Sequence, residues 1–172
     1  MLRKLFFGCV AIMLISLPVM ADPAASPFKE YFPNGLLDRE GKEVSLDVLQ
    51  GKYVGIYFSA GWCPSCQQFS PKMVPFRDKN VNEFEVVFVS WDKTEEAQFS
   101  YMKEYGMFWP TLKWHSIPTY NLKNKFQVST IPTLVVLSPL GELVTRDGRY
   151  DVQSNPDGAL EKWKAIHGLR HP

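Results

Sequence analysis

The hydrophobic pattern of the chain predicts four β-strands. Apolar runs rich in β-branched and aromatic residues indicate strands at 53–58, 84–91 and 133–137. The first run is continuous rather than alternating, which is typical of a strand covered on both faces of a sheet. A short turn at 138–141 leads into a fourth run at 142–146, and so short a connection requires two antiparallel strands.

Helices and turns are predicted between and before these strands. Turn-forming residues within 36–44 indicate a small hairpin, and Ser45 is placed to cap a short helical turn after it. A helix is expected over 67–79. Pro71 and Pro75 lie inside it, and because proline removes a backbone hydrogen bond, we expect a kink near Pro71 and a break by Pro75.

The second half of the chain alternates helices with one irregular segment. Thr94 is expected to cap a helix, and a short helix is predicted over 120–125. The aromatic segment 106–118 between them is either a packed loop or a wall beside an active site. Asn155 is predicted to cap the last helix, with Pro156 at its first position. A parallel strand pair extended by a hairpin and covered by helices gives an α/β fold.

The N-terminal segment 1–21 is predicted to be a secretory signal peptide. Arg3 and Lys4 precede an apolar run at 5–17, and small residues end the segment at Ala21. The run is shorter than the roughly 20 residues that a membrane-spanning helix needs. Export to a bacterial periplasm is therefore expected, with the mature chain starting after Ala21. The alternative is an inner-membrane anchor formed by residues 5–20.

The remaining chain is expected to form one domain. Residues 22–34, rich in proline and alanine, are predicted to be a linker, and residues 35–168 the folded domain. Removal of residues 1–21 takes away two of the 19 basic residues and none of the 18 acidic ones, so the net charge falls to about −1. That balance gives no electrostatic reason to expect a nucleic-acid partner. A monomer is expected.

The cysteines are the strongest indication of chemistry. Of three, Cys9 lies in the predicted signal peptide, which leaves Cys63 and Cys66 at CxxC spacing between a strand and a helix. A helix N-terminus favours a thiolate, the species that attacks a disulfide. A disulfide with a two-residue spacer closes almost no loop, so it restrains the unfolded chain little. The pair could also be half of a zinc site, but the three histidines stand at no recognisable spacing.

These motifs resemble the thioredoxin superfamily, and more narrowly its tryparedoxin and nucleoredoxin branch. The resemblance covers residues 35–165. It is carried by the cysteine turn, by an Ile-Pro-Thr sequence about 65 residues later, and by a proline five residues after the second cysteine. The matching segments are 57–66, 69–72, 84–92, 131–133, 148–149 and 155–156. The resemblance implies a thioredoxin-like fold, a single domain with a central mixed β-sheet flanked by helices.

The resemblance also implies roles for individual residues. Cys63 would attack and Cys66 would resolve, and their disulfide would be the redox group, with no separate cofactor and no metal. The residues expected at the substrate face are Trp62, Pro64, Ile131 and Pro132, with a cis bond before Pro132. The residues that could support the site are Tyr57, Trp91 and Asp92. The Ile131 backbone would pair with an extended substrate segment.

Two departures from the family pattern affect the expected mechanism. Tyr57 stands where thioredoxin itself has an acidic residue that assists proton transfer, so the route of the second thiol's proton is open. Ser65 stands between the cysteines where strong oxidants have a histidine, and the nearest basic residue in sequence is Lys72. A moderate stabilisation of the thiolate is therefore expected, which favours a reductant or isomerase over an oxidising disulfide donor.

The predicted function is an exported protein-disulfide reductase that acts on protein thiols and disulfides and is fed by a membrane electron donor. A copper chaperone of the same fold is the non-enzymatic alternative. Such proteins usually space their cysteines by three residues and use a histidine. Here no histidine stands just before Pro132.

Overall fold

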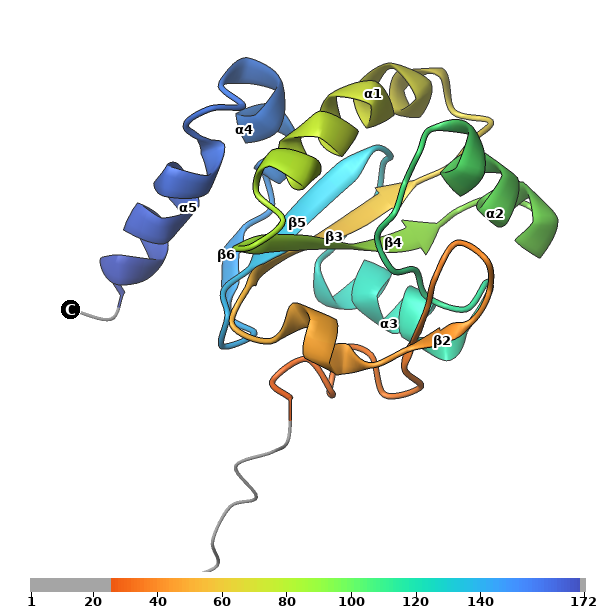
Figure 1. Ribbon diagram of the computed structural model, residues 1–172, viewed down its shortest axis with the longest axis horizontal. Helices are drawn as coiled ribbons and strands as arrows, with labels where there is room; N and C mark the ends of the chain where they lie inside the picture. Colours follow the sequence, from red (N-terminus) through yellow and green to blue (C-terminus); the bar gives the residue numbers. More distant parts are fainter. Residues whose placement is uncertain (1–25, 171–172) are drawn as a thin grey trace, which may run out of the picture.

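A four-stranded mixed sheet forms the centre of the computed structural model, which describes residues 26–170 (Figure 1). The strand order is β4-β3-β5-β6, with bounds β3 Tyr53–Ser59, β4 Phe84–Ser90, β5 Thr133–Leu137 and β6 Leu143–Thr145. Strands β3 and β4 are parallel, whereas β5 pairs antiparallel with both β3 and β6. The mixed sheet and the antiparallel hairpin at its edge confirm the expected α/β thioredoxin-like architecture.

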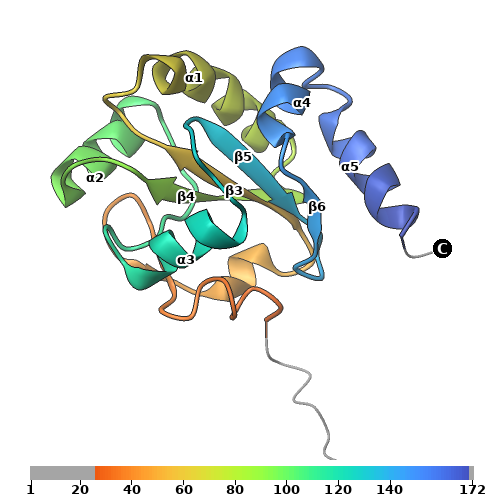
Figure 2. The ribbon, with the colours of Figure 1, turned by 180° about the vertical axis from the view of Figure 1, so that it is seen from behind.

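Helices cover both faces of this sheet (Figures 1 and 2). They are α1 Pro64–Lys79, α2 Glu95–Glu104, α3 Ile117–Lys125, α4 Gly148–Ser154 and α5 Ala159–Gly168. One hydrophobic core packs the sheet against α1, α2, α4 and α5. A second core on the opposite face packs it against α3 and the short 3₁₀ helix Leu46–Leu49. The cysteine turn lies where β3 passes into α1.

Alternation along β3 divides its side chains between the two cores. Tyr53 and Tyr57 pack with α1 and α5, whereas Val54, Ile56 and Phe58 pack on the α3 side. Successive side chains of a strand point to opposite faces, so a continuous apolar run is the pattern that a doubly covered strand requires. The strand can therefore deliver Ser59 and the following turn to a fixed position.

The N-terminal part of the domain forms a small hairpin and the capped turn that follows it. Strands β1 Leu36–Leu37 and β2 Glu43–Val44 pair antiparallel, and the Ser45 side chain accepts a hydrogen bond from the Asp47 backbone N–H. Thr111, in the predicted irregular segment, bridges the hairpin to the main sheet through Leu37 and Phe88. The segment 106–118 thus links two sheets rather than forming a free loop.

The prediction that residues 22–34 form a linker is wrong for the described residues 26–34. These residues form turns in which Phe28 and Phe32 are fully buried in the α3-side core. The Tyr31 hydroxyl donates a hydrogen bond of 2.7 Å to the Gly141 carbonyl, which ties the segment to the β5–β6 turn. Proline and alanine content indicated a linker, but burial of two phenylalanine rings outweighs it.

Two helix predictions also need correction. Helix α1 runs unbroken past Pro75 to Lys79. Asn155 is the C-cap of α4 rather than the N-cap of the last helix, which begins at Ala159 after a turn. The glycine at 148 allows α4 to lie on the sheet, because a Cβ there would come within 2.9 Å of the Leu134 carbonyl oxygen. Sequence pattern alone did not indicate α4.

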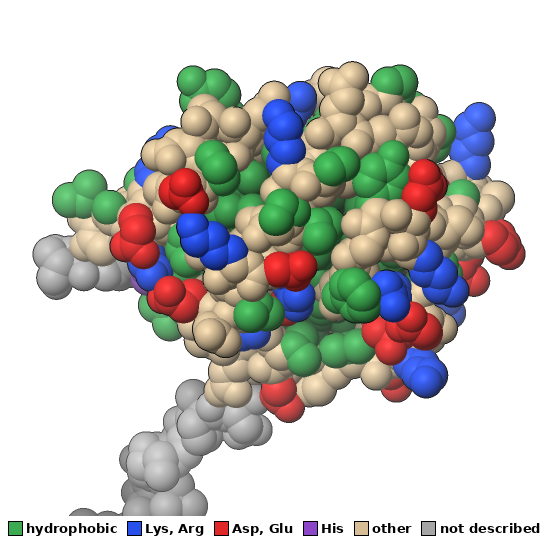
Figure 3. Space-filling model, turned by 45° about the horizontal axis from the view of Figure 1, so that its top comes forward, with side chains coloured by type: hydrophobic (Ala, Val, Ile, Leu, Met, Phe, Trp, Pro, Cys, Tyr) green, Lys and Arg blue, Asp and Glu red, His purple; other side chains and the backbone are tan. Residues whose placement is uncertain are grey.

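The predicted signal peptide at 1–21 lies outside the described residues. Within residues 26–170, no helix has both the length and the apolar character needed to cross a membrane. On the face drawn in Figure 3, basic and acidic side chains are interspersed with apolar ones.

Candidate active site

The two cysteines occupy the start of α1. Cys63 is the N-cap residue, and Pro64 takes the first helical position, where its missing N–H costs no hydrogen bond. The Cys63 sulfur accepts a hydrogen bond of 3.4 Å from the Cys66 backbone N–H. The structure shows both cysteines as free thiols. The sulfur of Cys63 therefore fills the role of a capping side chain, and a helix N-terminus stabilises negative charge there.

Local hydrogen bonds favour the thiolate of Cys63. Its burial alone would raise the thiol pKa, but hydrogen bonds from the Cys66 thiol and the Ser65 hydroxyl outweigh burial and lower the pKa. The Ser65 oxygen lies 3.2 Å from the Cys63 sulfur. Donors that point at a charged atom stabilise the charged form, which is the reason for the lowered pKa. Cys63 is thus the thiol of the pair that ionises more readily.

Cys66 has the opposite character. Its side chain is fully buried beneath the turn, and burial, together with its hydrogen bond to Cys63, raises the pKa to about 12. A hydrogen bond from Ser59 and one from the Ala60 backbone oppose that rise. The pair therefore consists of one thiol that ionises readily and one that holds its proton, as attack followed by resolution requires.

A backbone carbonyl borders the reactive sulfur. The Ile131–Pro132 peptide bond is cis, as the family resemblance implied, and it precedes β5. The Ile131 carbonyl oxygen lies 3.8 Å from the Cys63 sulfur and 3.5 Å from the Ser65 hydroxyl. The structure thus brings Ile131 and Pro132 together with the cysteine turn, although 65 residues separate them from Cys66 in sequence.

Trp62, Trp91 and Asp92 form one side of the turn. The Trp62 ring is 55% exposed, and its indole N–H donates to the Trp91 carbonyl at 3.0 Å. The Asp92 carboxylate accepts hydrogen bonds of 2.8 Å from the Gly61 N–H and the Ser90 hydroxyl. Burial raises the pKa of Asp92 despite these two bonds. Asp92 therefore holds the loop that carries Trp62 rather than touching either sulfur.

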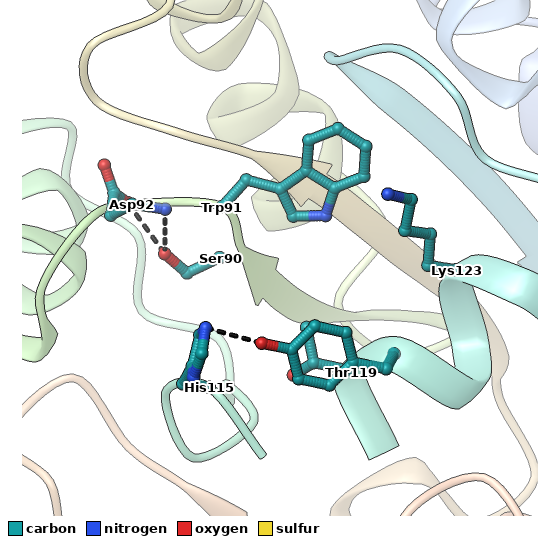
Figure 4. Close-up of a pocket in the computed structure, with 7 residues that line it drawn as sticks. Ser90, Trp91, Asp92, His115, Thr119 and Lys123 are labelled. Carbon is teal, nitrogen blue, oxygen red and sulfur yellow. Dashed lines mark hydrogen bonds between the residues drawn. The ribbon is translucent and has the colours of Figure 1, made fainter. Parts of the chain in front are cut away.

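A cavity of about 210 Å³ opens beside Trp91 (Figure 4). Its lining includes Asp92, His115 and Lys123, and the Lys123 ammonium lies 4.8 Å from the centre of the Trp91 ring. His115, from the irregular segment, and Tyr120, from α3, share a hydrogen bond of 2.5 Å. The segment 106–118 therefore contributes to a wall near the cysteine turn as well as packing in the core.

Sequence reasoning missed three hydroxyl residues below the cysteines. Tyr57, which it did single out, contacts Ser59 and Ser70, and these two serines also contact Tyr101 from α2. Two of the three could have been found from spacing. Ser59 shares a strand face with Tyr57, and Ser70 lies one helical turn after Cys66. Only the packing of α2 against the sheet brings Tyr101 to this place.

The sequence matches the thioredoxin-like family over residues 51–143. The chain belongs to the thioredoxin-like family. Tryparedoxin of Trypanosoma brucei brucei is 39% identical over 145 residues, covering 80% of this chain and 98% of that protein. Mouse nucleoredoxin is 35% identical over 80% of this chain, but the match covers 32% of nucleoredoxin. This thioredoxin-like chain thus spans about a third of the length of the nucleoredoxins it matches.

Solved structures give the same assignment. Tryparedoxin from Trypanosoma brucei has a TM-score of 0.70 at 38% identity, covering 80% of this chain and 97% of that one. Tryparedoxin II in complex with glutathionylspermidine has a TM-score of 0.71 at 32% identity, with coverage of 77% and 95%. This thioredoxin-like protein therefore falls in the tryparedoxin and nucleoredoxin branch of the superfamily. Among residues 26–170, no group of three or more histidine, cysteine or acidic side chains is arranged to hold a metal ion.

Proposed function

We propose that this protein is an exported thiol–disulfide oxidoreductase that reduces or isomerises disulfides in protein substrates. One observation carries the proposal: the two thiols of the turn have opposite pKa shifts. Hydrogen bonds lower the pKa of Cys63, and burial raises that of Cys66. A thiol with a lowered pKa forms more of the attacking thiolate at a given pH, and a neighbouring thiol that stays protonated until needed can then release the product.

The proposed reaction has two steps. The Cys63 thiolate attacks one sulfur of a substrate disulfide, forming a mixed disulfide and releasing the other substrate sulfur as a thiolate that takes a proton from solvent. The Cys66 sulfur then attacks Cys63, so a Cys63–Cys66 disulfide forms and the second substrate sulfur leaves as a thiol. Two electrons pass from the cysteine pair to the substrate. A membrane electron donor would reduce the pair again, because the exported compartment is oxidising.

Substrate would dock along the backbone before β5. The Ile131 carbonyl is close to the Cys63 sulfur. Pairing of an extended substrate segment with this backbone would present its disulfide to Cys63 without requiring a particular sequence. The exposed Trp62 ring would cover the other side of the bound segment. This mode of binding suits an extended protein segment rather than a small ligand enclosed in a pocket.

The reducing direction rests on the neighbours of Cys63. Its stabilising groups are neutral: the Ser65 hydroxyl, the Cys66 thiol and backbone N–H groups. Neutral donors stabilise a thiolate less than a cation does, so the disulfide should resist reduction more than that of a strong oxidant. We expect a reduction potential nearer the thioredoxin value of about −270 mV than the strong-oxidant value of about −120 mV.

An insulin-reduction assay with dithiothreitol tests the activity. Wild-type protein should accelerate precipitation of the insulin B chain, and Cys63→Ser should abolish that acceleration. Cys66→Ser should instead accumulate mixed disulfides with its substrates, which non-reducing electrophoresis detects. Activity that survives in Cys63→Ser would overturn the proposal. A glutathione equilibrium placing the pair above about −150 mV would make the protein a disulfide donor instead.

Export is tested separately. N-terminal sequencing of the exported protein should begin at Asp22, because the predicted cleavage follows Ala21. A chain that begins at Met1 and sediments with membranes would indicate the anchored form.

A further inference from the structure

The cavity of about 210 Å³ beside Trp91 adjoins the reactive cysteines. The Trp91 side chain is half-buried and packs against the small apolar cluster that contains Cys63 and Cys66. Trp91 also lines the cavity, together with His115, Tyr120 and Lys123. We name this cavity the Trp91 pocket. The reactive pair and the Trp91 pocket therefore share one aromatic side chain as a common wall.

Contacts to the rest of the fold hold the walls of the Trp91 pocket in place. His115 lies opposite Trp91 in Figure 4 and shares a hydrogen bond of 2.5 Å with the Tyr120 hydroxyl. The Trp114 ring stacks on His115 with 4.9 Å between ring centres, and its indole N–H donates to the Asp92 carbonyl at 3.0 Å. Because these contacts tie the His115 wall to the end of β4, the pocket is preformed.

Lys123 is the group in the Trp91 pocket that is free to bind a charged ligand. Within residues 26–170 its ammonium forms no ion pair, and it lies 4.8 Å from the centre of the Trp91 ring. A contact with a ring face gives the ammonium no hydrogen-bond acceptor, so its three N–H donors can still bind one. The pocket thus offers a positive charge beside an aromatic surface.

Asp92 also lines the Trp91 pocket, but its carboxylate is already engaged. One oxygen accepts a hydrogen bond of 2.8 Å from the Gly61 N–H, and the other accepts one of 2.8 Å from the Ser90 hydroxyl. The single hydrogen of Ser90 is used in that bond. Burial raises the pKa of Asp92, which favours its uncharged form. Asp92 and Ser90 therefore serve the cysteine loop, and Lys123 decides which charge the pocket accepts.

We propose that the Trp91 pocket binds an acidic side chain of the protein substrate, two residues away from the cysteine that Cys63 attacks. This inference rests on the proposed exchange reaction. In an extended segment, side chains two positions apart lie on the same face and about 7 Å apart. That spacing brings one side chain to Cys63 and the other past the shared Trp91 ring to Lys123. The substrate carboxylate binds the Lys123 ammonium, and its methylene groups pack against Trp91.

The position of the Trp91 pocket suits a protein segment. Tyr120 and Lys123 are exposed, so a segment that lies across the surface can place one side chain in the pocket while its backbone stays outside. In recognition of extended peptides, backbone hydrogen bonds give affinity and side-chain pockets give specificity. The pocket would therefore select among substrates that the Ile131 backbone binds alike.

Peptides whose cysteine carries thionitrobenzoate in a mixed disulfide test this inference. The Cys63 thiolate attacks the peptide sulfur, a Cys63–peptide disulfide forms, and coloured thionitrobenzoate leaves with the electron pair of the broken bond. Stopped flow at low ionic strength gives the second-order rate constant for peptides with Glu or Gln two residues before or two residues after the cysteine. At least one Glu peptide should react about two- to fivefold faster than its Gln counterpart, the range expected for an ion pair with an exposed partner.

Peptides with Glu directly next to the cysteine are the matched control. Adjacent side chains of an extended segment point to opposite faces, so this Glu points away from the Trp91 pocket. These peptides should react no faster than their Gln counterparts. Equal acceleration by Glu at both kinds of position would indicate general electrostatic attraction and would overturn the inference.

Substitutions of Lys123 test the assignment of the binding group. Lys123→Met keeps a long side chain but removes the charge, so it should abolish the preference for Glu. Lys123→Glu should reverse it, so that a peptide with Lys at the same position reacts faster than the Gln peptide. Lys103→Met is the matched control, because Lys103 is an exposed lysine of α2 outside the pocket and its loss changes the net charge equally. A preference that survives in Lys123→Met, or disappears in Lys103→Met, would refute the assignment.

The outcomes separate this inference from the proposed function. Equal rates for all peptides with the wild-type protein would overturn the inference and leave the exchange reaction standing. Release of thionitrobenzoate no faster than with Cys63→Ser would overturn the function itself. The comparison of peptides needs only wild-type protein, so it decides the inference even if a Lys123 variant does not fold.

Discussion

Ser65 offers the most direct test of how this fold activates its first cysteine. Its hydroxyl lies 3.2 Å from the Cys63 sulfur and is one of the groups that lower the thiol pKa. A hydrogen bond to a charged atom contributes about 1.5–3 kcal/mol, and a partly exposed donor belongs at the lower end of that range. Ser65→Ala should therefore raise the pH midpoint of Cys63 ionisation by about one unit, since one unit corresponds to about 1.4 kcal/mol.

Iodoacetamide alkylation across a pH series measures that midpoint. The sign follows from the charged state: fewer donors face the thiolate, so a higher pH is needed to form it. Below the midpoint the thiolate fraction falls about tenfold, but a more basic thiolate is also more nucleophilic, with a Brønsted coefficient of about 0.4–0.5. The two effects combine to a rate about threefold lower at acidic pH. The rate at alkaline pH should rise by a similar factor.

The same substitution should change the redox equilibrium. A less stable thiolate means a less stable reduced form, so the disulfide becomes harder to reduce and the potential falls by about 30 mV. Ser154→Ala, an exposed serine of α4, is the control and should change neither quantity. An unchanged midpoint together with an unchanged potential in Ser65→Ala would refute the assignment of Ser65 as a thiolate donor.

Three further predictions follow from the packing of the site. In the wild-type protein near pH 7, peptide mapping should show Cys63 alkylated at least tenfold faster than Cys66, because burial raises the pKa of Cys66 to about 12. Equal alkylation rates would contradict the assigned roles of the two cysteines. Gly55→Ala should lower the free energy of unfolding in urea by about 1–3 kcal/mol, because the added Cβ would lie 2.6 Å from the Phe84 ring and 2.9 Å from the Leu134 side chain. An unchanged unfolding midpoint would contradict the packing of β3. Asp92→Ala should cost about 1–3 kcal/mol by leaving the Gly61 N–H without its acceptor, measured in the same way, and a neutral result would mean that the loop is held by other contacts.

Local sequence pattern predicted the elements around the cysteines well. The apolar run that became β3, the hairpin after β5 and the caps at Ser45 and Thr94 each depend on residues close together in the chain. It failed where long-range packing decided the outcome. Proline content in 26–34 indicated a linker, yet two phenylalanine rings from that segment fill a core whose other side chains come from distant elements.

The C-terminal region shows the same division. Asn155 and Pro156 carry a typical helix-start signal, but α4 packs against α1 and β5 and ends at Asn155, so the next helix starts later. Capping preferences contribute about 1 kcal/mol, which the burial of α4 side chains such as Val152 can outweigh. Helix boundaries near competing packing surfaces are therefore poorly determined by local signals.

The sequence by itself determined the reactive pair. Two cysteines at that spacing lie close enough to form a disulfide, and their position between a strand and a helix places the first of them at a helix N-terminus. It also determined the fold family, through motifs spread along the chain. Only the tertiary structure decided which groups surround the sulfurs. Ile131 reaches Cys63 through the pairing of β5 with β3, and the Tyr101 hydroxyl reaches Ser59 and Ser70 through the packing of α2. Contacts of this kind join residues that no local spacing relates, so the environment that sets each thiol's pKa emerges only when the chain is folded.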